Sequence, residues 1–487
     1  MADPLKFYLI TDLHHYAPSL GTSGKAYEKW NNKEQKCLAE TGAIIDAAFS
    51  KLIADKDIDI VLIAGDLTST GAMESHLDLL PKLQRLRDAG KQVYLITATH
   101  DFISSEMEPL RCEGDELLPA TPTPRPKLRE LYADFGWDRA VSEHKESFSY
   151  CVKLKKGFRL LCMNDDGTPE RHGYTESQIE WMFSQIEEAK KNGDYIFVMN
   201  HHPCLPPNPI YPLFSKKDML ADYDEITTRL ADSGVNLVFT GHTHMQNIAV
   251  KRTEKGNVFY DVNTSSLVGY PTAIRKVTID DEKIDVRTEQ IDDFDFDRNG
   301  LSVNDYLKNH FTFFLNDIIS STAYDIDHLA DLAPSFSMTA ETVYKLKVPL
   351  KIIGTLLNNR TVGAAAKYLG VSGKIDDRAR GIVLKDLVLQ IMINLYHGDE
   401  PFYPGSPEYG AMNAFMGRIK KLVRPFDKDG KIKGILDAVL SSMYDAPLSE
   451  RLPWEQNIKS LKSKSFPCRM ALQSPLTPAA TVAQTIQ

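Results

Sequence analysis

The sequence predicts an α/β protein built on a parallel sheet. Three short apolar runs of strand type lie at residues 5–10, 58–64 and 92–97, and the segments between them, about 34–54 and 74–89, carry apolar residues at helical spacing. Apolar runs of this length are typical of strands buried on both faces, and strands that alternate with helices form βαβ units. We therefore expect a βαβαβ unit at the start of the chain.

This alternation is interrupted once and then resumes. Residues 103–145 contain the proline-rich stretch TPTPRP and a short helical pattern at about 127–134. A long insertion between core elements often faces the substrate, so we expect it near the functional site. Further strands are expected at 147–154, 158–163, 195–199 and 235–240, helices at 175–191 and 218–233, and an antiparallel finish at 246–252, 258–262 and 274–288.

The C-terminal part has a different pattern, which indicates a second structural region. At 487 residues the chain exceeds the size at which one hydrophobic core usually stops growing. We place the catalytic α/β domain at 1–295, a mostly helical region at 296–471 and a loose tail, with little to bury, at 472–487. Helices of the second region are expected near 304–320, 340–358, 362–369, 377–396, 409–423 and 431–443.

Composition and charge exclude several classes of protein. The chain is 43% apolar and 25% charged, as is usual for globular proteins, and its net charge is −9. The acidic excess lies in residues 1–299, because residues 300–487 hold 22 Lys and Arg against 18 Asp and Glu. This balance argues against a protein that coats nucleic acid. No apolar run approaches the roughly 20 residues of a membrane helix, so no membrane span is expected.

The N-terminal residues and the cysteines are those of a cytoplasmic protein. The stretch MADPLKFYLITD lacks a basic start and a long apolar segment, so we expect no secretory signal. Six cysteines are scattered along the chain without CxxC pairs, which indicates neither a disulfide framework nor a zinc knuckle.

Aspartate and histidine residues follow the predicted strands. Side chains at positions i and i+2 of an extended segment point the same way, so Asp12 with His14, and His242 with His244, are each expected to face one point past a strand end. Ligands of parallel sheets bind at these carboxyl ends. The candidate site residues at such positions are Asp12, His14, Asp66, His100, Asp101, His201, His242 and His244.

The chemistry of this set favours metal ions. Imidazoles combined with carboxylates suit Mn, Fe or Zn. Asp66 is a single carboxylate that could bridge two ions, and two such ions clamp the attacking and leaving oxygens of an in-line phosphoryl displacement. His100 is placed to stabilise the phosphoryl oxygens or to protonate the leaving oxygen.

The motifs DLH, GDLT, THD, HHP and GHTH occur in this order between residues 12 and 244, and together they resemble the signature of calcineurin-like metallophosphoesterases. The HHP block and the domain size resemble most closely the class III cyclic-nucleotide phosphodiesterase branch. The resemblance covers roughly residues 5–290. It implies a four-layer α/β/β/α sandwich with a dinuclear site between the facing sheets.

The resemblance also implies roles for individual residues. Position 99 departs from the family pattern, because Thr99 stands where the family has an asparagine that ligates the second ion, and a hydroxyl is the weaker ligand. We therefore expect the second ion to be held less tightly. The first ion is expected on Asp12, His14, Asp66 and His244, the second on Asp66, Thr99, His201 and His242, with His100 as the catalytic outer histidine and Asp101 orienting it.

These observations favour a phosphodiesterase that uses two transition-metal ions, with a metal-bridging hydroxide attacking a cyclic nucleotide or another small phosphodiester. A phosphomonoesterase or protein phosphatase is the alternative, and a degenerate metal-binding scaffold is the alternative outside enzymes. Homo-oligomerisation or partner binding is assigned to the helical region.

Several neighbouring residues keep two interpretations. His15 and His202 flank ligands and either line the pocket or have no role in it. Asn164 and Asp165 close a strand, where a turn role is favoured, and Asn200 either supports a ligand or does not. The isolated residues His310, His328 and His397 are interpreted as structural.

Overall fold

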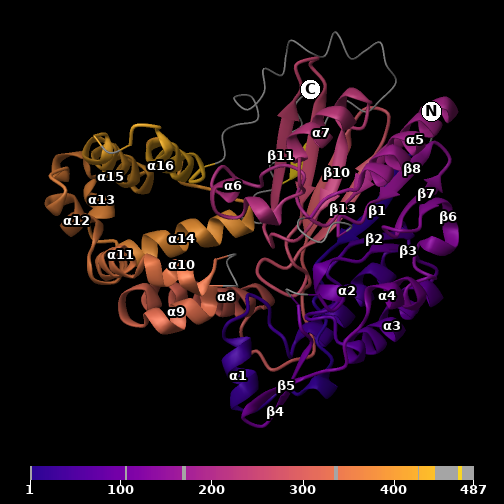
Figure 1. The fold of residues 1–487 in the computed structure, drawn as a ribbon, viewed down its shortest axis with the longest axis horizontal. Coiled ribbons are helices and arrows are strands. Elements are labelled where there is room, and N and C mark those ends of the chain that lie inside the picture. Colours follow the sequence, from indigo (N-terminus) through magenta and orange to yellow (C-terminus); the bar gives the residue numbers. More distant parts are fainter. Residues whose placement is uncertain are drawn as a thin grey trace.

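The computed structural model describes residues 3–104, 107–166, 172–333, 338–425, 427–444 and 470–473. Two β-sheets with helices form one part of the molecule, and a group of helices lies at one side of them (Figure 1). The predicted α/β class with a helical C-terminal region is therefore confirmed. Of the expected loose tail, residues 474–487 lie outside the described residues, whereas Leu472 and Gln473 belong to a strand.

The first sheet has the strand order β15-β14-β13-β1-β2-β3. Strands β1, β2 and β3 are parallel, β13 is antiparallel to both β1 and β14, and β14 is parallel to β15. The expected single strand at 274–288 is wrong, because residues 280–283 turn the chain between two strands. The strands are β1 (Leu5–Ile10), β2 (Ile60–Ala64), β3 (Gln92–Ile96), β13 (Ile274–Ile279), β14 (Ile284–Glu289) and β15 (Met470–Gln473).

The second sheet has the order β11-β12-β10-β9-β8-β7-β6, with parallel pairing from β12 through β8. Its strands are β6 (Ala140–His144), β7 (Ser149–Lys155), β8 (Phe158–Cys162), β9 (Tyr195–Met199), β10 (Leu237–Thr240), β11 (Asn247–Arg252) and β12 (Val258–Asn263).

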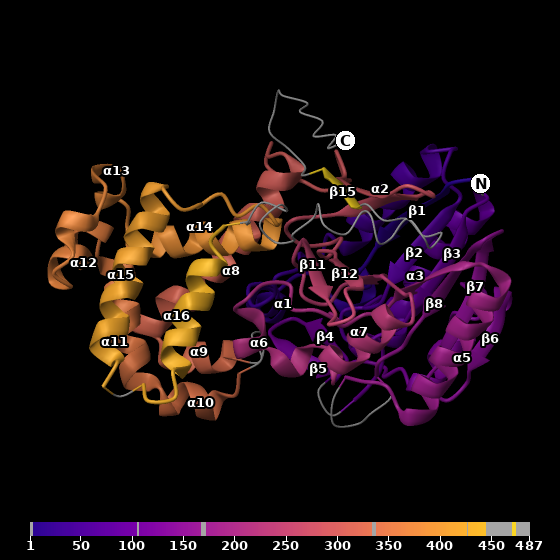
Figure 2. The same cartoon turned by 90° about the horizontal axis from the view of Figure 1, so that it is seen from above.

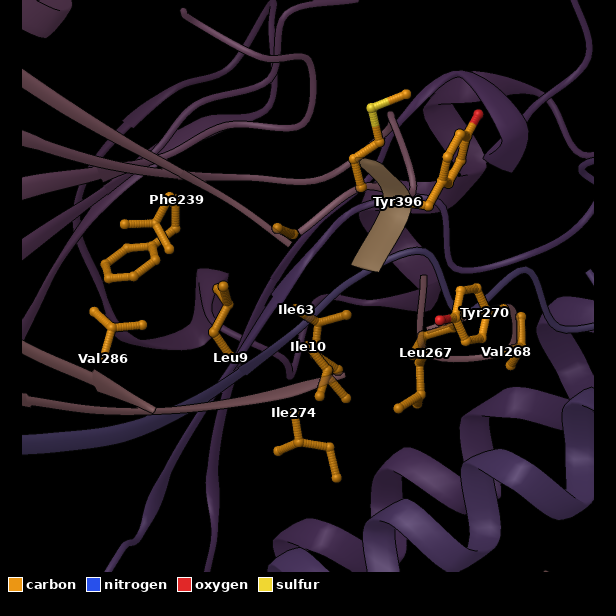
Figure 3. Packing of buried hydrophobic residues seen from close by; sticks show 14 of the residues in the cluster. Leu9, Ile10, Ile63, Phe239, Leu267, Val268, Tyr270, Ile274, Val286 and Tyr396 are labelled. Carbon is orange, nitrogen blue, oxygen red and sulfur yellow. The ribbon is translucent and has the colours of Figure 1, made fainter. Parts of the chain in front are cut away.

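The two sheets face each other, and helices cover their outer sides. Phe7 of β1 stacks on Phe197 of β9 at 5.6 Å and meets Phe239 of β10 edge-on at 5.4 Å. Successive strand residues point to opposite faces, so the neighbouring Tyr8 points outward and donates its hydroxyl to Asp55 at the end of a helix. Figure 3 shows part of this packing around Leu9, Ile63 and Phe239. The helices are α2 (Thr41–Ala54) and α3 (Met73–Asp88) beside the first sheet, and α5 (Glu176–Asn192) and α7 (Tyr223–Asp232) beside the second.

Residues 103–145 form a hairpin, a helix and an edge strand. The hairpin of β4 (Leu110–Glu113) and β5 (Glu116–Pro119) packs against α1 (Lys25–Asn31), a helix that the sequence patterns did not predict. The expected helix at 34–54 begins only at α2, and residues 32–40 form an irregular segment. The other elements within 103–145 are α4 (Arg125–Leu131) and the 3-10 helix Trp137–Arg139. A further short helix, α6 (Tyr211–Phe214), follows β9.

Helices α8 and α14 connect the helical region to the sheets (Figure 2). Phe311 of α8 stacks on Tyr270, and Tyr396 of α14 packs on Phe311 at 4.6 Å. The helix expected at 377–396 is interrupted near Gly381. The helices are α8 (Val303–Tyr324), α9 (Ile326–Leu332), α10 (Ala340–Lys345), α11 (Lys347–Asn359), α12 (Val362–Tyr368), α13 (Asp377–Arg380), α14 (Leu384–His397), α15 (Pro407–Val423) and α16 (Lys431–Ser441). Among the described helices, none has the length and apolar character needed to cross a membrane.

Candidate metal centre

Five strand ends from the two sheets meet at one place, where the predicted ligands lie. β1, β2 and β3 end side by side in one sheet, and β9 and β10 do so in the other. The carboxyl ends of parallel strands are the usual ligand sites of α/β proteins. Four groups of His and Asp side chains offer ligand atoms that lie within 4.8 Å of one another: His201, His202 and His242; Asp12, His14 and His244; His14, Asp66 and His100; and Asp12, Asp66 and His201.

Asp12, His14 and His244 form the first cluster. The Nε2 atoms of His14 and His244 are 3.0 Å apart, and Oδ1 of Asp12 lies 3.5 Å from the former and 3.3 Å from the latter. Two ligand atoms that each lie about 2.1 Å from one ion are separated by roughly 3.0–3.4 Å, so this spacing suits a shared transition-metal ion.

Asp66 lies between the clusters and uses its two oxygens differently. Its Oδ2 is 3.7 Å from Nε2 of His14 and 3.1 Å from Nε2 of His201. Its Oδ1 accepts the backbone N–H of His100 at 3.1 Å. One oxygen thus faces a histidine of each cluster, as a bridging ligand requires.

His201, His202 and His242 form the second cluster. Nδ1 of His201 donates to the carbonyl of Ala64 at 2.8 Å, because a carbonyl can only accept, and Nε2 is therefore free to act as a ligand. The ring of His242 lies 5.4 Å from that of His201 and 4.3 Å from that of His202.

The backbone at the ligands is not extended, so the geometry inferred from i, i+2 spacing is wrong. The φ angles are positive at Asp12 (52°), His14 (37°), Asp66 (50°), His242 (68°) and His244 (56°). Asp and His tolerate this left-handed region better than most residues, yet each such residue costs about 1–3 kcal/mol and persists where its surroundings hold it. Here the N–H groups of Asp12 and His14 donate to the carbonyls of Gly65 and Asp66.

Two glycines allow the strand ends to approach closely. A Cβ at Gly241 would lie 2.4 Å from Oδ2 of Asp12 and 2.2 Å from Oγ1 of Thr11. A Cβ at Gly65 would lie 2.7 Å from Nδ1 of His201, and the φ of Gly65 is +93°. Both positions therefore require glycine if the ligands are to keep their places.

His100 is held differently from the sequence-based expectation. Its Nδ1 donates to the carbonyl of Ser69 at 2.6 Å, which leaves Nε2 without that proton. Asp101 was expected to orient this ring, but its carboxylate accepts the N–H groups of Ala98 at 2.8 Å and Thr68 at 2.9 Å. Asp101 thus holds the turn that carries His100. Thr99 is half-buried in the 3-10 helix Thr99–Asp101, and its role as a ligand stays a prediction.

Burial and neighbouring charges shift the pKa values of the residues in this centre in different directions. Burial alone favours the neutral ring of His201, but the carboxylate of Asp66 outweighs burial and raises the pKa of His201 to about 10. Burial, together with the carboxylate of Asp66, raises the pKa of Asp101 to about 8. Burial and the charge of Lys36 lower the pKa of His14 well below its usual value, which keeps its ring neutral, as a metal ligand must be.

Sequence patterns missed one supporting residue in the irregular segment 32–40. Oε1 of Gln35 lies 3.1 Å from Nδ1 of His244, and Nε2 of Gln35 lies 3.4 Å from the hydroxyl of Tyr396 in α14. Metal-binding histidines usually donate their second ring nitrogen to such an oxygen. No strand end or motif marks Gln35, and its contact with α14 spans a separation along the chain that local patterns do not reveal.

The structure distinguishes between the two interpretations of the residues that neighbour the ligands. His15 turns away toward α3, where its Nε2 lies 2.7 Å from Asp78. Asn164 donates to Thr97 and stabilises a turn. Asp165 accepts from Nδ2 of Asn200 at 2.6 Å and lies 2.9 Å from Nδ1 of His202, so both residues support the second cluster.

Comparisons with known proteins agree with this geometry. A model of the calcineurin-like phosphoesterase family matches residues 5–246. The uncharacterized metallophosphoesterase YhaO of Bacillus subtilis is 30% identical over 112 residues, which are 23% of this chain, and the match spans about a quarter of that relative's length (26%).

Solved structures with a related fold have low similarity. A dimetal phosphatase from Danio rerio has a TM-score of 0.41 and 14% identity, and the match covers 57% of this chain and 96% of that one. The NAD nucleotidase of Haemophilus influenzae has a TM-score of 0.34 and 12% identity, with 74% and 62% covered. These values carry no information on substrate. The segment that matches the calcineurin-like phosphoesterase family, residues 5–246, contains all the predicted ligands.

Proposed function

We propose that the protein is a dinuclear-metal phosphodiesterase that hydrolyses cyclic nucleotides or other small phosphodiesters. The match of residues 5–246 to the calcineurin-like phosphoesterase family supports a metal-dependent phosphoester hydrolase. The observation that carries the proposal is Oδ2 of Asp66, which lies beside His14 of one cluster and His201 of the other. A shared carboxylate oxygen between two ligand sets is what a pair of ions requires.

The residues fit such a pair. Asp12, His14, Asp66 and His244 would hold one ion, and Asp66, His201 and His242 would hold the other. When bound, two ions supply a nucleophilic hydroxide at neutral pH and offset charge on the phosphoryl oxygens. The nitrogen-rich ligand set suits Mn, Fe or Zn.

His100 contributes at the leaving oxygen. Its ring meets that of His14 edge-on, with centroids 4.7 Å apart, so it lies beside the first cluster. Because Nδ1 donates to Ser69, Nε2 is the nitrogen left for a substrate, and a ring that also takes up a proton at Nε2 would pass that proton to the departing oxygen. The carbonyl of Ser69 keeps the ring in this orientation.

The preference for a diester rests on the His201-His202-Pro203 block and its resemblance to the class III branch. The test is turnover of bis(p-nitrophenyl) phosphate against p-nitrophenyl phosphate by the metal-loaded, full-length protein. A higher kcat/KM for the diester, abolished by a chelator and restored by Mn²⁺, supports the proposal. A preference for the monoester replaces it with a phosphomonoesterase. Absence of turnover of either ester by protein loaded with two ions contradicts enzymatic function.

A further inference from the structure

We propose that His202 is a ligand of the second metal ion, a role that the family motif does not give it. The inference rests on the dinuclear centre proposed above. His201, His202 and His242 each offer a ring nitrogen, and these atoms lie within 4.8 Å of one another. The three imidazoles therefore converge in the manner of a metal-binding group.

The two nitrogens of His202 have different surroundings. Nδ1 lies 2.9 Å from Oδ1 of Asp165, which can only accept, so Nδ1 carries the proton. Nε2 is buried and has no hydrogen-bond partner among the described residues. A buried nitrogen left without a partner is destabilising, and a bound cation removes that cost.

Asp165 is fixed in a way that supports this function. Its Oδ2 accepts Nδ2 of Asn200 at 2.6 Å and the backbone N–H of His202 at 3.2 Å. A carboxylate that holds the far nitrogen of an imidazole fixes the tautomer and makes the near nitrogen a better ligand. The chain thus contains a carboxylate–imidazole pair in which Asp165 occupies Nδ1 and leaves Nε2 of His202 open.

A purely structural histidine explains less. The ring of His172 stacks on that of His202 with centroids 3.7 Å apart and planes 9° apart, and Asp165 satisfies Nδ1. These contacts account for one face and one nitrogen of the ring. They give no function to Nε2, which is buried without a hydrogen-bond partner among the described residues.

This ligand offsets the departure at Thr99. With His202, the second ion has three imidazoles and the carboxylate of Asp66, whichever way Thr99 faces. Such a set favours the softer transition metals over Mg²⁺. We then expect the second ion to be bound more tightly than the first, which is the opposite of the expectation that rested on Thr99 alone.

The experiment is a calorimetric titration of the metal-free, full-length protein with Zn²⁺. The parent is compared with His202→Phe, Asp165→Asn and the control His15→Gln, whose ring neighbours a ligand but turns to Asp78. We expect His202→Phe to weaken one of two ions by at least about 100-fold and Asp165→Asn to weaken it by about 10–100-fold, with the control unchanged. X-ray absorption of the loaded proteins should count one imidazole fewer in His202→Phe over the pair of ions.

The outcomes separate this inference from the proposed function. Two ions in the parent with an unchanged imidazole count in His202→Phe would overturn the role of His202 and leave the dinuclear centre intact. A parent that binds fewer than two ions would overturn both. If His202→Phe fails to fold, Asp165→Asn decides, because it keeps the ring, and an unchanged affinity there contradicts the inference.

Discussion

At the scale of single residues, the centre depends on which ring nitrogen each histidine leaves open. His201 and His100 donate Nδ1 to the backbone carbonyls of Ala64 and Ser69, and His244 turns its Nδ1 to Gln35. Each arrangement fixes one tautomer and directs Nε2 into the site. These partners come from separate parts of the chain, so the strand-end pattern could identify the histidines but not the atoms that orient them.

His100→Ala should lower kcat by about 10²–10⁴-fold and leave both ions bound, because we propose that its ring donates a proton and does not bind an ion. The loss should shrink for diesters with good leaving groups, which need no protonation. Steady-state kinetics over a series of aryl leaving groups, combined with metal analysis, checks this. Loss of an ion from the variant would make His100 a ligand instead.

At the scale of elements, the strand ends are held close by residues that have no chemistry of their own. Gly241 follows β10, and its backbone packs against the side chains of Thr11 and Asp12 after β1, so the two sheets approach each other closely at the site. The βαβ pattern placed these strands correctly. The left-handed backbone after them could not be foreseen, since it is imposed by hydrogen bonds between different strand ends.

Gly241→Ala should displace Asp12 and weaken the first ion, because the new methyl group meets Oδ2 of Asp12 at 2.4 Å. The matched control is Gly417→Ala in α15, where a Cβ has nothing within 4 Å. Calorimetric titration should show weaker binding of one ion in Gly241→Ala and none of this effect in the control. Equal affinities in both variants would contradict the close approach.

His76 of α3 should make stability depend on pH. Its ring lies between the hydroxyl of Tyr132 at 2.7 Å and the carbonyl of Asp101 at 2.8 Å, and burial lowers its pKa to about 4. The pKa of His76 is near 6.5 in the unfolded chain, so between pH 6.5 and pH 4 the unfolded chain binds more protons than the folded one. The contribution of the neutral His76 ring to stability is therefore present above pH 6.5 and is lost as pH falls toward 4 and below.

The expected size of this loss is roughly 3 kcal/mol once pH is below the folded pKa. Denaturant unfolding of the metal-free protein across this range, compared with His76→Gln, measures it. The glutamine can still donate to the Asp101 carbonyl but does not titrate, so its stability should fall less on acidification. If the free energy of unfolding changes with pH in the same way in the parent and in His76→Gln, His76 does not titrate in this way.

At the scale of the whole molecule, the helical region reaches the metal centre. Tyr396 of α14 contacts Gln35, which in turn contacts His244, and His310 of α8 lies 2.9 Å from the carbonyl of Glu34. The sequence separated this region from the catalytic domain by composition and helical spacing. It could not show that α8 and α14 support the segment 32–40, because that contact depends on tertiary packing (Figure 1).

Gln35→Leu should weaken the first ion by about 10–100-fold, as expected when the partner of a metal-binding histidine is removed. Tyr396→Phe should act in the same direction but less strongly, since it removes only the longer hydrogen bond to Gln35. The control is Tyr409→Phe in α15, a tyrosine whose ring meets that of Tyr444 edge-on within the helical region. Should Gln35→Leu bind both ions as the parent does, the helical region does not act through His244.

The central claim is that one carboxylate holds two ions, and metal content after removal of that carboxylate tests it most directly. Asp66→Ala and His244→Ala are purified with two equivalents of Mn²⁺, desalted, and analysed for bound metal alongside the parent. We predict that the parent retains both ions, that His244→Ala loses one, and that Asp66→Ala loses both because its Oδ2 faces each cluster. Retention of both ions by Asp66→Ala would contradict the bridging role and with it the dinuclear centre described here.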